Sequence, residues 1–75
     1  MTTLLQVPKK TEMIIAAVDG ARSFRRRLME MGLVPGTPIK IIEVAPLGDP
    51  LEIEVRCSRL SIRKAEAAQI RVAPR

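Results

Sequence analysis

Short apolar runs that alternate with prolines and glycines make up most of this sequence. Runs of this length, bounded by turn-forming residues, are typical of β-strands. We expect strands at about residues 13–18, 39–44, 51–57, 60–62 and 70–72, with a single helical turn at 64–68. The pattern therefore predicts about five short strands, and no internal repeat accompanies them.

The two most regular runs flank the segment Pro46-Leu47-Gly48-Asp49-Pro50. Its prolines lack an amide hydrogen and limit strand pairing at both ends of the segment, so we predict a hairpin with this segment as its loop. In the second strand apolar side chains alternate strictly with polar ones, which predicts that Leu51, Ile53, Val55 and Cys57 face the core. On this interpretation Cys57 is a small buried hydrophobe with an inert thiol.

Between Ala21 and Met31 the apolar spacing becomes helical. Phe24, Leu28 and Met31 stand at i, i+4 and i+7, which places them on one face of a helix. The spacing predicts one α-helix over about residues 21–31, inserted after the first strand.

Three small residues after this helix predict how the chain turns. Gly32 is placed to cap the helix, because glycine readily adopts the positive φ that a helix end requires. Pro35-Gly36 has the pattern of a type II turn, in which proline sets φ and glycine accepts a positive φ at the next position. The chain is expected to leave this turn as a strand.

The order of these elements indicates the fold class. About five short strands with one inserted helix suit a small closed or nearly closed barrel, because closure removes the exposed strand edges. A chain of 75 residues has room for one core, so residues 1–75 are expected to form a single, mainly β domain. Small barrels carry many functions, and the fold alone does not identify one.

Composition narrows the possible partners. The chain has 13 lysines and arginines against 8 aspartates and glutamates, a net charge of +5 that favours nucleic acid, an anionic membrane surface or an acidic protein. Cys57 is its single cysteine, so no intramolecular disulfide can form. With neither a signal-peptide pattern nor an apolar run of about 18 residues, we expect a cytoplasmic protein without membrane insertion.

Catalytic and metal-binding patterns are missing from the sequence. There is no histidine, and the glycines form neither a GxGxxG pattern nor a Walker-type run. Glu52 and Glu54 share the outer face of one predicted strand, which is usually a solvated face rather than a cation site. We therefore expect no enzyme activity, no cofactor and no tight metal site within one chain.

The predicted helix carries a concentration of arginines. Arg22, Arg25 and Arg26 lie together on a face distinct from the apolar stripe, and Met29 projects among them. A flexible thioether beside arginine is common at protein interfaces, so Arg25, Arg26 and Met29 are candidate partner-binding residues; an ordinary solvated face is the alternative. An RNA-binding barrel is a rival function, although Phe24 is the only aromatic residue available to stack a base.

Three segments of the sequence, residues 26–37, 45–50 and 60–70, together resemble the FeoA family of ferrous-iron-transport accessory proteins. Residues 26–37, Arg-Arg-Leu-Met-Glu-Met-Gly-Leu-Val-Pro-Gly-Thr, match RRLxxMGLxPGT; residues 45–50 match APLGDP; and residues 60–70 are similar to LALRxxEAxxI. The segments agree in order and spacing over nearly the whole chain. Lys10 and Cys57 stand where members often carry glycine, and Ser58 where an aromatic residue is frequent.

The resemblance implies an SH3-like barrel with an inserted helix. It also implies a non-enzymatic accessory role in bacterial or archaeal ferrous iron uptake, with FeoB, the membrane transporter that has a cytoplasmic GTPase domain, as the partner. Leu47, held in the hairpin loop by two prolines, is expected to extend the surface formed by Arg25, Arg26 and Met29. RNA or another acidic partner remains the alternative.

Overall fold

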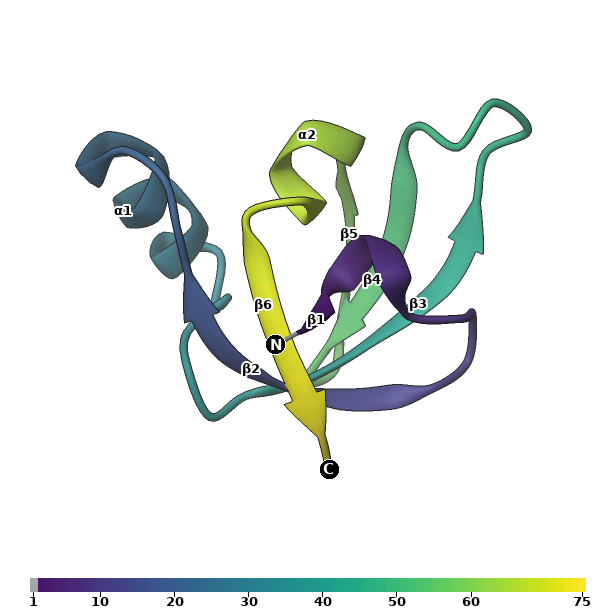
Figure 1. Cartoon of the computed structure of the whole chain (residues 1–75), viewed down its shortest axis with the longest axis horizontal. Coiled ribbons are helices and arrows are strands. Elements are labelled where there is room, and N and C mark those ends of the chain that lie inside the picture. Colours follow the sequence, from purple (N-terminus) through teal and green to yellow (C-terminus); the bar gives the residue numbers. More distant parts are fainter. Residues whose placement is uncertain (1) are drawn as a thin grey trace.

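The computed structural model describes residues 2–75. Its elements are, in chain order, β1 (Thr2–Thr3), the 3-10 helix η1 (Leu4–Gln6), β2 (Glu12–Val18), α1 (Arg22–Glu30), β3 (Pro38–Val44), β4 (Leu51–Val55), β5 (Ser58–Ile62), α2 (Lys64–Ala67) and β6 (Ile70–Pro74). The predicted mainly β fold with an inserted α-helix is confirmed (Figure 1). The helix follows β2 and not the first strand, because the short strand β1 precedes β2.

The strands form one antiparallel sheet in the order β1-β6-β2-β3-β4-β5. The register shifts between Ile15 and Ala17 in β2, and between Ile41 and Glu43 in β3. Such bulges bend a strand and increase its twist. The strands can therefore surround a common interior, as Figure 1 shows, although the sheet contains few of them.

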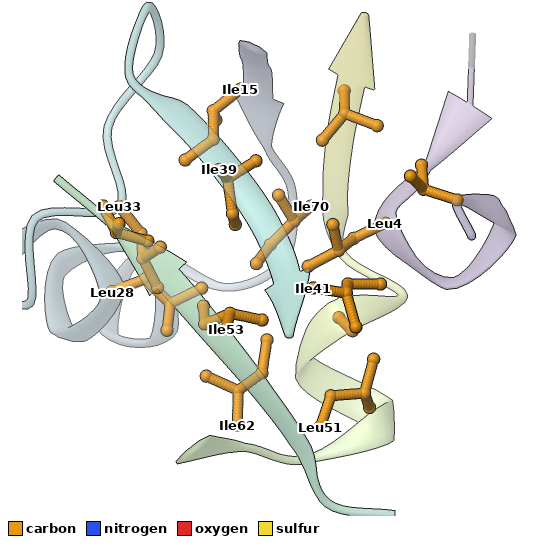
Figure 2. Close-up of a cluster of buried hydrophobic side chains, with 14 residues drawn as sticks. Leu4, Ile15, Leu28, Leu33, Ile39, Ile41, Leu51, Ile53, Ile62 and Ile70 are labelled. Carbon is orange, nitrogen blue, oxygen red and sulfur yellow. The ribbon is translucent and has the colours of Figure 1, made fainter. Parts of the chain in front are cut away.

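The interior of this sheet is aliphatic. Figure 2 shows side chains from β2, β3, β4, β5 and β6 pointing toward one another, with Leu28 and Leu33 joining them from the helix side. The buried residues are Leu4, Val7, Ile15, Leu28, Leu33, Ile39, Ile41, Leu51, Ile53, Val55, Ile62, Ala67, Ile70 and Val72. The alternation predicted for the second hairpin strand holds for Leu51, Ile53 and Val55.

The N-terminal segment contributes to the core in a way that the sequence pattern did not predict. Thr2 and Thr3 pair with Val72 and Arg71 of β6, and η1 follows directly. Leu4 is 0% exposed and belongs to the main core cluster. This segment is too short to show either a helical or an alternating period, so only tertiary packing identifies it.

The prediction that Cys57 faces the core is wrong. β4 ends at Val55, and the short loop to β5 consists of Arg56 and Cys57, with the cysteine exposed. Arg56 has φ +58°, a left-handed conformation typical of tight hairpin loops. The alternating strand ends two residues earlier than predicted. Cys57 continues the apolar pattern by chance, because it lies in the hairpin loop and not in the strand.

An exposed Cys57 makes a measurable prediction. We expect the thiol of the folded protein to react with a disulfide reagent at a rate close to that of the protein unfolded in guanidinium, because the reagent can reach an exposed thiol without unfolding. Stopped-flow absorbance measures both rates. A thiol that reacts only after denaturation would show that the loop is covered in solution.

The end of α1 and the turn after it follow the predicted pattern. The amide of Gly32 donates to Met29 O and that of Leu33 to Leu28 O, which together form a Schellman cap. Gly32 has φ +90°. Thr37 N donates to Val34 O across the turn, and Gly36 at φ +93° takes the position that a type II turn requires.

Candidate functional site

One face of α1 is fixed to the rest of the protein. Leu28 is 0% exposed, and Phe24 is half-buried against the core cluster. Arg27 extends toward α2, where its guanidinium lies 2.8 Å from a carboxylate oxygen of Glu66 and 5.7 Å from the centre of the Phe24 ring. Because Phe24 is held in this way, it is poorly placed to stack a nucleic-acid base.

The apolar stripe of α1 is shorter than its spacing predicted. Met31 was expected on the packed face with Phe24 and Leu28, but it is 38% exposed. The helix ends at Glu30 and Met31 is its C-cap, so the helical period does not extend to this residue. Leu33, after the cap, takes the buried place and is 1% exposed.

The opposite face of α1 carries Arg22, Arg25, Arg26 and Met29, as the helical spacing predicted. All four side chains are exposed, and Met29 is 57% exposed. Within residues 2–75 none of the three arginine side chains forms an ion pair or a hydrogen bond. This face therefore combines uncompensated positive charge with an exposed flexible apolar side chain.

These residues form one wall of a groove of about 420 Å³, here called the α1 groove. It lies between α1 and the segments before and after the helix. The lining residues are Val18, Arg22, Arg25, Arg26, Met29, Leu33 and Pro35. The structure thus brings together three of the four candidate residues, Arg25, Arg26 and Met29. It places them beside Arg22 of the same helix, Val18 of β2, and Leu33 and Pro35 of the segment between α1 and β3.

Leu47 does not belong to this groove. It is 93% exposed in the β3–β4 loop, and Figure 1 shows that loop at the opposite end of the molecule's long axis from α1. The loop is held by a hydrogen bond of 2.7 Å from Gly48 N to Ala45 O, and Asp49 Oδ1 accepts one of 3.0 Å from Lys64 N. Leu47 is therefore an exposed apolar residue separate from the α1 groove, because the β3–β4 hairpin extends away from α1.

Several basic side chains elsewhere in the protein pair with nearby carboxylates. Lys9 pairs with Glu43, Arg59 with Glu52, Arg71 with Asp19 and Arg75 with Glu12, at separations from 2.7 to 3.3 Å. The hydrogen bond from Lys9, together with that from Val44 N, lowers the pKa of the Glu43 carboxyl below its ordinary value. Within residues 2–75 the arginines that line the α1 groove have no such carboxylate partner.

The described part of the chain contains no group of three or more His, Cys, Asp and Glu side chains that could hold a metal ion. We predict that monomeric protein purified in chelator-free buffer carries less than one iron or zinc per chain, because the sequence has no histidine and one thiol. Elemental analysis of the monomer fraction provides the test. One tightly held metal per chain would contradict the prediction.

A family model for the FeoA domain matches residues 2–74. The chain belongs to the FeoA family. Its predicted membership is therefore confirmed, and with it a link to ferrous iron transport. In Porphyromonas gingivalis a fusion protein of Fe(2+) transport protein A and the Fe(2+) transporter FeoB is 39% identical over 59 residues, which cover 79% of this chain and 7% of the fusion protein.

Solved FeoA structures share the fold. The FeoA-like protein from Clostridium acetobutylicum is 38% identical, with a TM-score of 0.86 over 99% of this chain and 90% of its own. Stenotrophomonas maltophilia FeoA, solved with zinc and described as an SH3 domain protein and a candidate activating factor of ferrous iron transport, is 28% identical, with a TM-score of 0.83 over 97% of this chain and 91% of its own. The fold expected for a FeoA protein, an SH3-like barrel, is confirmed. No helix within residues 2–75 has the length and apolar character needed to cross a membrane.

Proposed function

We propose that this FeoA protein is a non-enzymatic accessory module that acts in the cytoplasm on a FeoB-type ferrous iron transporter. The observation that carries the proposal is the fusion protein of Porphyromonas gingivalis, in which a segment similar to this chain is joined to a FeoB transporter. Fusion into one polypeptide keeps two modules at a high effective concentration, which is useful when they act on each other.

The α1 groove is the surface proposed for this contact. Arg25, Arg26 and Met29 are exposed, lie together, and have no part in the core. Exposed arginines steer an acidic partner and contribute hydrogen bonds once it is bound. Leu47 is proposed as a second contact, reached only by a partner that extends to the other end of the barrel.

The double substitution Arg25→Glu with Arg26→Glu tests this function. Both side chains are exposed, so the free energy of unfolding should change by only about 0.5 kcal/mol. Retention of the transporter's cytoplasmic part in a pull-down should fall by about tenfold or more, and iron-dependent growth of a deletion strain should be lost in parallel.

The matched control is Arg56→Glu with Arg63→Glu, which changes the net charge equally at two exposed arginines that do not line the groove. It should bind and complement like the wild type. If the wild-type protein does not bind the transporter and instead binds RNA with a steep salt dependence, the proposed accessory function is wrong and the nucleic-acid alternative is supported.

A further inference from the structure

The α1 groove is lined by two kinds of side chain: apolar residues, here called its floor, and arginines, here called its rim. Val18, Leu33 and Pro35 line it together with Met29, and the remaining lining residues are Arg22, Arg25 and Arg26. We propose that this groove binds a short acidic peptide segment, which places one aliphatic side chain on the floor and its carboxylates on the arginines. The peptide chemistry follows from the groove itself; only the identity of the protein that carries the segment rests on the proposed function.

The floor selects an aliphatic anchor. None of its lining side chains is aromatic, so it provides no surface on which a nucleobase would stack. Leu33 is 1% exposed and belongs to the core, whereas Met29 is 57% exposed and can adopt several rotamers. The floor therefore combines a rigid residue with a flexible thioether, and it can adjust to a branched side chain such as leucine or isoleucine, whose burial favours binding.

One wall of the groove is preorganised. The turn that carries Pro35 is tied to β2, because Gly36 N donates to Ile15 O at 2.7 Å and Ile15 N donates to Thr37 O at 2.9 Å. The Schellman cap fixes the exit of α1 at Gly32 and Leu33. Little backbone entropy is then lost when a segment binds, which favours a short ligand.

The rim selects negative charge. The three lining arginines have no carboxylate partner within residues 2–75, and no acidic residue lines the groove. Guanidinium groups pair with carboxylates in a bidentate manner, so each arginine can orient one acidic side chain. A peptide with one apolar side chain next to acidic side chains would complement this surface. A free anion could bind the arginines, but it would leave the apolar floor exposed to solvent.

The test uses overlapping short peptides that tile the cytoplasmic part of the FeoB-type transporter, added to the ¹⁵N-labelled full chain. We expect the amide resonances of Val18, Arg25, Met29 and Leu33 to shift with acidic peptides that contain leucine or isoleucine. Replacing that residue by serine, or the peptide's glutamates by glutamine, should each weaken binding by about tenfold.

Two variants of the protein complete the experiment. Arg22→Glu and Met29→Glu should abolish the shifts, whereas Arg63→Glu, an equal charge change outside the groove, should retain them. A dispersed amide spectrum confirms that each variant is folded, and Arg22→Glu keeps the test valid if Met29→Glu does not fold.

The outcomes separate this inference from the proposed function. If the transporter's cytoplasmic part binds the protein but no peptide perturbs the groove, or Arg22→Glu binds as the wild type does, the groove proposal is overturned while the accessory function stands. Groove shifts produced instead by anionic phospholipid vesicles or a short RNA also overturn it. If acidic peptides bind the groove but the intact cytoplasmic part does not, the groove chemistry is supported and the proposed partner is wrong.

Discussion

Replacing Leu28 by alanine is expected to destabilise the folded protein by about 2–5 kcal/mol. Leu28 is 0% exposed and is the buried residue through which α1 joins the core. It also accepts the hydrogen bond from Leu33 N, so the cavity would form next to the helix cap. Because small domains have about 5–15 kcal/mol of total stability, this loss is a large fraction of it.

Chemical denaturation monitored by circular dichroism measures the change, because the midpoint falls in proportion to the lost free energy. Met29→Ala is the matched control: it removes a side chain of similar size from the next position, where 57% of the side chain is exposed. The control should differ from the wild type by about 0.5 kcal/mol. Equal losses for the two variants would contradict the packing of α1 on its Leu28 face.

Gly36→Val is expected to lower the free energy of unfolding by about 1–3 kcal/mol, because a β-branched residue is strained at φ +93°. A Cβ built on Gly36 meets no atom within 4 Å, so the cost comes from the backbone conformation and not from a collision. The turn lies between α1 and β3 and is tied to β2 by the hydrogen bond from Gly36 N to Ile15 O. Strain there is expected to loosen the wall of the α1 groove.

Gly36→Asn tests whether the loss of stability comes from the backbone conformation of residue 36 or from the size of the new side chain. Asparagine is close to valine in volume but tolerates positive φ better than other residues with a Cβ, so it should retain much of the stability that valine loses. Thermal unfolding of both variants measures the difference. Equal stability of the valine variant and the wild type would mean that residue 36 leaves the left-handed conformation in solution.

The separation of the α1 groove from Leu47 determines how a partner can bind. A partner that contacts both would have to reach from one end of the barrel to the other, as Figure 1 shows. A partner that uses the groove alone needs only a short segment. The groove variants and Leu47→Ser therefore distinguish a compact contact from an extended one.

Short-range patterns in the sequence determined α1, the turn that follows it and the alternation within β4. Phe24 and Leu28 at helical spacing predicted α1, and the glycines at 32 and 36 predicted where the helix stops and the chain turns. Strict alternation predicted which side chains of β4 are buried. These features depend on interactions between neighbours in sequence, such as capping bonds and strand pleating, so local patterns are sufficient to find them.

Tertiary structure alone decided which faces meet. Leu4 fills the core although its segment has no period, Cys57 lies in a loop although it continues one, and Val18 and Pro35 join Met29 in a groove although they belong to separate segments. Leu47 and Met29 are both exposed, but only the tertiary structure shows that they lie at opposite ends of the molecule. A periodic pattern shows which side of an element is apolar, but not which other element covers it. Burial depends on residues that are distant in sequence and are brought together only when the sheet curves around the core.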